Sequence, residues 1–249
     1  MRKKQSFLDD KSKKRKFDAF NIISNMIFIG LLVLFIIVLS KCISDMINAE
    51  NSSDFVVPLL MRISAIILTI LPYIISKIFK LNYPRIVIIM YYLFLFLSLY
   101  LGTFLGLYIQ APLYNRFVHA YGGLFLGIIS MFFVRLINKD RTKNLHPMLV
   151  FLFVFVFSMG FEACWEIWEF TGDKIFGLNM QVFMKDGVEL VGREALKDTM
   201  FDIICNSIGA IIGATICAIS SYKFNDYIDY FKITKKEIKK STEIEEIEE

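Results

Sequence analysis

Three glutamates lie inside an apolar stretch that is otherwise typical of a membrane-spanning helix: Glu162, Glu166 and Glu169. Their spacing of four and then three residues places all three carboxylates on one face of a helix. Ionisable side chains are costly in the hydrocarbon core of a bilayer, so they usually mark a functional site or pair with one another. These glutamates are therefore the first candidates for chemistry in the chain.

Further polar residues open two other apolar stretches. Asp198, Asp202 and Asn206 repeat the four-residue step, and Arg116 and His119 stand at the start of an earlier stretch. If the helices cross the membrane in alternating directions, all these groups and the three glutamates fall in the same, outer half of the bilayer. The sequence therefore predicts one polar cluster that three helices build together.

The composition of this cluster suits metal or acid–base chemistry. Its carboxylates outnumber its cations, and burying that excess charge requires a bound cation, neutral carboxyl groups or access to water. One histidine among several carboxylates suits zinc, manganese or magnesium. We expect four residues to be catalytic or metal-ligating: His119, Glu162, Glu166 and Asp202. We expect four others to bind substrate: Arg116, Glu169, Asp198 and Asn206.

Structural roles stay open for some of these residues. Asp198 also suits the cap of a helix, Glu169 a wet membrane interface, and Asn206 a contact between helices. No motif names a reaction, because the chain has no His-Glu-x-x-His helix, Gly-x-Ser-x-Gly elbow, Walker loop or dinucleotide fingerprint.

The elements that must position the cluster are membrane helices. Apolar residues make up 56% of the 249 residues, and the mean hydropathy is +0.55. They occur in blocks of about 20 residues, the length that crosses a bilayer as a helix. We expect an all-α bundle of six transmembrane helices within a domain over 20–220. The predicted spans are 20–39, 56–79, 87–108, 117–137, 148–168 and 199–220.

Charge predicts the orientation of the bundle. Most of the 28 Lys and Arg residues fall in a basic arm over 1–19, in two alternate connections and in a charged tail over 221–249. The positive-inside rule therefore places both termini in the cytoplasm and the connection 170–198 outside a cell membrane. The net charge of +4 follows from this topology, so we expect the lipid bilayer as a partner and no nucleic acid.

Two local patterns predict further structure. The Asp186-Gly187 pair, flanked by mixed apolar and polar residues, indicates a short two-stranded hairpin in the outer connection. This hairpin either lies over the polar cluster or only joins two helices. Glycine pairs at spacing four, Gly102 with Gly106 and Gly209 with Gly213, predict close packing of helices.

Three groups of residues carry a family resemblance. They are Tyr114 to His119 with Gly122 and Gly123, the three glutamates of 162–169, and Asp198-Thr199 with Asp202 and Gly209. Over residues 110–215 the chain resembles the YjdF-like bacterial inner-membrane proteins, whose biochemical role is not established. The resemblance implies a small helical membrane protein with a polar cluster, and it names no substrate.

Three functions fit these observations. The first is a metal-assisted enzyme at the outer leaflet that acts on a lipid head group or an envelope precursor, with Arg116 holding an anionic group. The second is a non-catalytic partner or assembly protein in which the cluster holds the bundle together. The third is a cation- or proton-coupled transporter, which the low charge of the first three spans disfavours.

Overall fold

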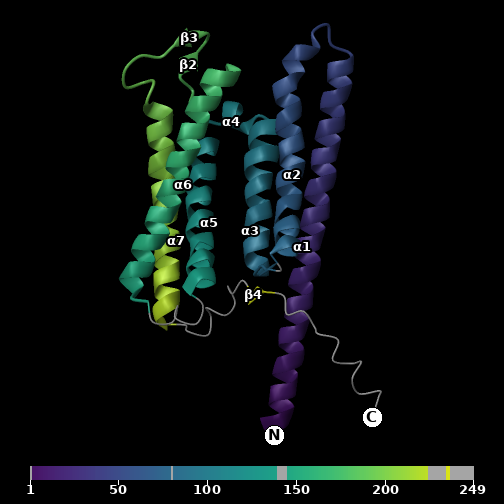
Figure 1. The fold of residues 1–249 in the computed structure, drawn as a ribbon, viewed down its shortest axis with the longest axis vertical. Helices are drawn as coiled ribbons and strands as arrows, with labels where there is room; N and C mark the ends of the chain where they lie inside the picture. Colours follow the sequence, from purple (N-terminus) through teal and green to yellow (C-terminus); the bar gives the residue numbers. More distant parts are fainter. Residues whose placement is uncertain (1, 80, 139–144, 224–233, 236–249) are drawn as a thin grey trace.

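The computed structural model describes residues 2–79, 81–138, 145–223 and 234–235 (Figure 1). Within these residues, six helices are long and apolar enough to cross a membrane. They cover Ile22–Ile47, Ser52–Ile78, Arg85–Phe104, Leu113–Val134, Pro147–Phe176 and Lys197–Ser221. The predicted all-α fold with six spans is confirmed.

The first three spans form one group of helices, on the right in Figure 1. Its elements are α1 (Arg2–Ile47), η1 (Ser52–Phe55), α2 (Val56–Ile78), α3 (Arg85–Leu95) and the π-helical η2 (Phe96–Phe104). α1 includes the predicted basic arm without a break in the helix. Apolar side chains hold the group together, and Phe35 and Ala65 are completely buried in it.

The third span ends earlier than the sequence predicts. Gly106 has a φ of 76°, in the left-handed region, and this conformation stops the helix before the one-turn helix α4 (Leu107–Gln110). The prediction that Gly102 and Gly106 form a contact between helices is therefore wrong. Gly102 instead leaves room for the ring of Tyr108, since a Cβ at this position would collide with it.

The last three spans form the second group: α5 (Pro112–Asn138), α6 (Pro147–Phe176) and α7 (Lys197–Lys223). α5 and α7 lie backbone to backbone at Gly209 and Gly213. A Cβ at Gly209 would overlap the carbonyl of Ala120, and one at Gly213 would lie 3.0 Å from the carbonyl of Leu124. The predicted small-residue contact of this helix is confirmed.

An aromatic layer joins the two groups. The ring of Phe94 on α3 stacks on Tyr121 and Phe125 of α5, with centroid distances of 6.4 and 5.9 Å. Around both groups, many large apolar side chains are exposed on the outer surface. A surface of this kind is stable in contact with lipid chains, because its exposed side chains are apolar.

The connection between α6 and α7, which the sequence predicts as an outer connection, is shorter than predicted, because α6 continues to Phe176 and α7 begins at Lys197. It contains the antiparallel strands β2 (Met184–Lys185) and β3 (Val188–Glu189). The turn residues Asp186 and Gly187 have φ values of 52° and 78°, as a type I′ turn requires. The predicted hairpin is confirmed.

A second pair of strands lies at the opposite end of the bundle. β1 (Leu81–Asn82), which precedes α3, pairs antiparallel with β4 (Thr234–Lys235). The strand β4 lies within the predicted charged tail over 221–249. Most of the tail lies outside the described residues.

Candidate functional site

A single buried stripe runs along α6 and changes from apolar to acidic. Its buried members recur about every three or four residues along one face of the helix, with two adjacent residues at the end: Val150, Val154, Ser158, Glu162, Glu166, Glu169, Gly172 and Asp173. Side chains at this spacing share one face of a helix. The three predicted glutamates are therefore all buried on the side that packs against the neighbouring helices.

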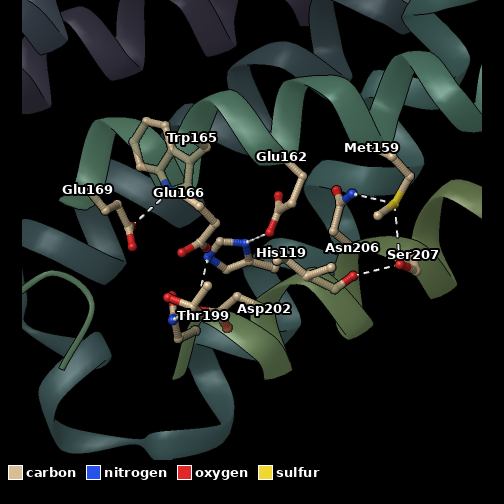
Figure 2. A network of polar contacts seen from close by, with 12 residues as sticks. His119, Met159, Glu162, Trp165, Glu166, Glu169, Thr199, Asp202, Asn206 and Ser207 are labelled. Atoms are coloured by element: carbon tan, nitrogen blue, oxygen red, sulfur yellow. Dashed lines mark hydrogen bonds and ion pairs between the residues drawn. The ribbon is translucent and has the colours of Figure 1, made fainter. Parts of the chain in front are cut away.

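His119 lies at the centre of the acidic half, between carboxylates of α6 and α7 (Figure 2). Its Nδ1 is 2.7 Å from Oε1 of Glu162, and its Nε2 is 3.6 Å from Oδ2 of Asp202. An ionised carboxylate only accepts hydrogen bonds, so the short contact to Glu162 requires a proton on Nδ1. Nε2 is then the ring nitrogen that can bind a metal ion or a second proton.

Asp202 on α7 is almost completely buried, at 1% exposure. Its Oδ2 accepts a hydrogen bond of 2.7 Å from Nδ2 of Asn115, one turn before His119 on α5. Its other oxygen, Oδ1, is buried without a hydrogen-bond partner among the described residues. An unsatisfied carboxylate oxygen in this environment costs free energy, so Asp202 is poised to bind a cation or a proton donor.

Glu166 contacts the outer connection. Its Oε2 lies 3.3 Å from Nε2 of Gln181, and the same amide nitrogen donates to Oγ1 of Thr199 at 3.0 Å. Oε1 of Glu166 is buried without a hydrogen-bond partner within the described part of the chain. Glu166 therefore has one oxygen held by the connection and one that is open to a ligand.

Asp173 holds Gln181 in this position. Its two carboxylate oxygens accept hydrogen bonds from the backbone amides of Met180 and Gln181, at 2.7 and 3.0 Å. Two backbone amides bound to one buried carboxylate fix the path of the chain after α6. The connection therefore lies over the cluster at Glu166.

Three side chains from three helices converge as possible metal ligands. His119, Glu166 and Asp202 each offer one ligand atom, and these atoms all lie within 4.8 Å of one another. Around a small divalent ion with bonds of about 2.1 Å, neighbouring ligand atoms are about 3 Å apart. The separations between these atoms would therefore shorten by up to about 2 Å when all three bind one ion.

Two of the predicted acids stand apart from this trio. Glu169 is buried, and its Oε1 accepts a hydrogen bond of 2.8 Å from Nε1 of Trp165, one turn away on the same helix. Asp198 is half-buried in the first turn of α7, where its Oδ2 has no hydrogen-bond partner among the described residues. Both are acids beside the trio, and neither has a hydrogen bond or ion pair with His119 among the described residues.

Arg116 and Asn206 lie on opposite sides of the trio along the helices. The guanidinium of Arg116 stacks over the ring of Phe201 at 4.2 Å. Asn206 is fully buried one turn beyond Asp202, where its Nδ2 lies 3.6 Å from Sδ of Met159 (Figure 2). Asn206 also packs against Gly123 of α5, so its surroundings are those of a contact between helices.

Sequence reasoning missed several neighbours of the site. Asp173 continues the stripe at the same four-residue step, so its spacing from Glu169 was the signal that could have identified it. Gln181 and Thr199 carry no such signal, because only the path of the connection brings them to Glu166. Tyr108 on α4 is another neighbour that the sequence did not indicate: burial, followed by the proximity of Tyr114, Glu169 and Asp202, raises the pKa of its hydroxyl.

Comparisons with known proteins identify the family of the chain. The profile of the family described as "Predicted membrane protein (DUF2238)" matches residues 25–223, which include every described residue of the site. No curated protein and no solved structure matches the chain. The chain belongs to the DUF2238 family.

Proposed function

We propose that this member of the DUF2238 family of predicted membrane proteins binds a divalent metal ion within its helical bundle and uses it for catalysis. The observation that carries the proposal is the convergence of His119, Glu166 and Asp202, whose ligand atoms lie within 4.8 Å of one another. A metal ion at this point would neutralise buried carboxylates for which the described residues provide no cationic partner other than His119.

The hydrogen-bonding pattern of His119 supports metal binding. Histidine ligands of metals usually donate their second ring N–H to a carboxylate or carbonyl, and this bond orients the ring and raises its basicity. Glu162 occupies that position, since its Oε1 lies 2.7 Å from Nδ1. We therefore assign Glu162 to the orientation of His119, and we assign the metal-binding role to the other three residues of the predicted set.

The ligand set favours particular metals. One imidazole with two carboxylates suits zinc or manganese, whereas magnesium prefers oxygen ligands and retains several waters. A bound metal of this kind acts as a Lewis acid and lowers the pKa of a water molecule. The reaction that follows is a metal-assisted hydrolysis or group transfer on a lipid head group or an envelope precursor. The distribution of Lys and Arg supports the outer leaflet as the location of this reaction.

Metal content tests the proposal. Full-length protein purified in detergent, incubated with zinc or manganese and then desalted, should retain a single metal ion per chain by elemental analysis. Glu166→Gln and Asp202→Asn should lose it and remain folded, whereas Glu189→Gln serves as the matched control because Glu189 is an exposed acid of β3. Equal metal content in all four proteins, or no metal in the wild type, would contradict the proposal.

An assembly role is the second candidate, and the packing of Asn206 favours it. Asn206 joins α7 to Met159 of α6 and to Gly123 of α5, so the polar layer also connects three helices. In that case Glu166→Gln should unfold the bundle, and wild-type protein should hold no metal. Thermal unfolding measured by circular dichroism on the same preparations separates the two candidates.

A transporter has less support. Among the described residues of the first three spans, the buried polar side chains are Ser24 and Thr69, and neither is ionisable. Ion-coupled transporters commonly carry polar groups in both of their repeats.

A further inference from the structure

Arg116 is a cation without a bound anion at the edge of the cluster. It is half-buried near the start of α5, and its guanidinium lies 4.2 Å from the centroid of the Phe201 ring. Among the described residues, no carboxylate forms an ion pair with it. The charge of Asp198 interacts with Arg116 at longer range, yet Oδ2 of Asp198 has no hydrogen-bond partner.

The position of Arg116 relates it to the proposed metal ion. Arg116 precedes His119 by three residues on α5, and Phe201 directly precedes Asp202 on α7. A separation of three residues corresponds to a rise of about 4.5 Å and to neighbouring positions on the helix surface. Arg116 and Phe201 are therefore close in sequence, on α5 and α7, to two of the three proposed metal ligands, His119 and Asp202.

The surface beside Arg116 is apolar. Phe117, Phe201 and Ile204 are exposed by 53%, 37% and 49%, and they lie on the same segments of α5 and α7 as Arg116 and the metal ligands. In a membrane-spanning segment, such side chains contact lipid chains. A ligand that reaches Arg116 from this side would need an anionic head and an apolar tail.

We propose that Arg116 holds the phosphate head group of a membrane amphiphile, whose apolar chain lies along Phe117, Phe201 and Ile204. This inference rests on the proposed function, because the same head group would face the metal ion. Guanidinium groups bind phosphate through two parallel N–H bonds, and stacking on an aromatic ring holds the guanidinium plane in place. The surrounding carboxylates would repel a phosphate, so Arg116 and the metal together supply the attraction.

Native mass spectrometry of lipid complexes tests the proposal. Metal-loaded full-length protein is titrated with phosphatidic acid and, separately, with phosphatidylcholine that has the same acyl chains. We expect the wild type to bind phosphatidic acid at least about 10-fold more tightly than phosphatidylcholine, which is the effect of one charge-assisted contact. The Arg116→Gln variant should lose this preference. Arg116→Lys should keep part of it, because the positive charge remains.

Arg62 offers a matched control. It is also a half-buried arginine stacked on a phenylalanine, at 5.1 Å from the ring of Phe104, but it lies in the other group of helices. Arg62→Gln should leave the preference for phosphatidic acid unchanged. An equal loss in Arg62→Gln and Arg116→Gln, or no preference in metal-loaded wild type, would overturn the proposal.

An additional measurement distinguishes a lipid phosphate from inorganic phosphate. If inorganic phosphate binds in an Arg116-dependent manner while phosphatidic acid shows no advantage over phosphatidylcholine, the ligand is a soluble phosphate and the amphiphile proposal is overturned. Metal content is measured on the same samples. Protein that holds metal without a lipid preference contradicts this inference alone, and protein with the preference but no metal contradicts the proposed function alone.

Discussion

Oε1 of Glu162 lies 2.7 Å from Nδ1 of His119, and this contact joins α6 to α5 inside the bundle. A carboxylate in the ionised form accepts hydrogen bonds only, so with Glu162 in that form the proton of this contact is on Nδ1. Nε2 is thereby directed toward Asp202, at 3.6 Å from its Oδ2. The chemistry proposed for the site depends on this orientation of the imidazole.

Substitution of Glu162 tests its role as the residue that orients His119. We expect Glu162→Ala to weaken metal binding by about 10- to 100-fold, as for other carboxylates that hold a histidine ligand. Glu162→Gln should have a smaller effect, because its amide oxygen can still accept from Nδ1. Competition with a chromophoric chelator measures both affinities. If Glu162→Ala lost metal binding as completely as Asp202→Asn, the result would instead indicate that Glu162 is a ligand of the metal.

Substitution of Asp173 tests how the outer connection is held over the site. Asp173→Ala removes the acceptor of two backbone amides, those of Met180 and Gln181, at a cost of about 1–3 kcal/mol for each group left buried and unpaired. We expect faster hydrogen–deuterium exchange at these two amides and faster release of metal, because the connection opens more readily. Glu189→Ala, at an exposed position of β3, is the control. Unchanged exchange at residues 180–181 would show that the connection is held by other contacts.

Two glycine substitutions test the packing that positions the ligands. Gly209→Ala should destabilise the bundle by about 1–3 kcal/mol, because its Cβ would overlap the carbonyl of Ala120 and force α5 and α7 apart. Gly160→Ala should be neutral or stabilising by up to about 1 kcal/mol, since no heavy atom lies within 4 Å of its Cβ position. Thermal unfolding in detergent measures both effects. Equal stability of the two variants would contradict the close approach of these helices.

Metal binding should depend on pH. A proton at Nε2 of His119 or on the open oxygens of Glu166 and Asp202 competes with the metal for the same lone pairs. Affinity should therefore increase as the pH rises, and binding should release protons. Titration calorimetry at one pH, in buffers of different ionisation enthalpy, measures the number of protons released on metal binding. Affinity that does not change with pH would indicate a site without these residues.

Local patterns were sufficient to predict much of the candidate site. Glu162, Glu166 and Glu169 are all buried on one face of α6, as their four- and three-residue spacing predicts. His119 and Asp202 were identified for the same reason, since each is an ionisable residue one helical turn from another polar residue. Helical periodicity is a local property, so it can be read without knowledge of the neighbouring helices.

Other features depend on contacts that local patterns do not encode. Gly102 and Gly106 have the spacing of a helix contact, yet Gly106 ends the third span and Gly102 receives the ring of Tyr108. Gln181 reaches Glu166 because the carboxylate of Asp173 turns the chain back over the bundle. Neither outcome follows from the residues on one segment alone.

The sequence by itself determined the six membrane spans, the acidic stripe and the hairpin, because hydrophobic length, helical period and turn chemistry act over short distances. Only the tertiary structure decided which polar groups meet. It brought His119, Glu166 and Asp202 within 4.8 Å of one another, paired Glu162 with Nδ1 of His119, and placed Arg116 over Phe201. These contacts arise from the close packing of α5, α6 and α7, which depends on glycine positions and side-chain shape across separate helices.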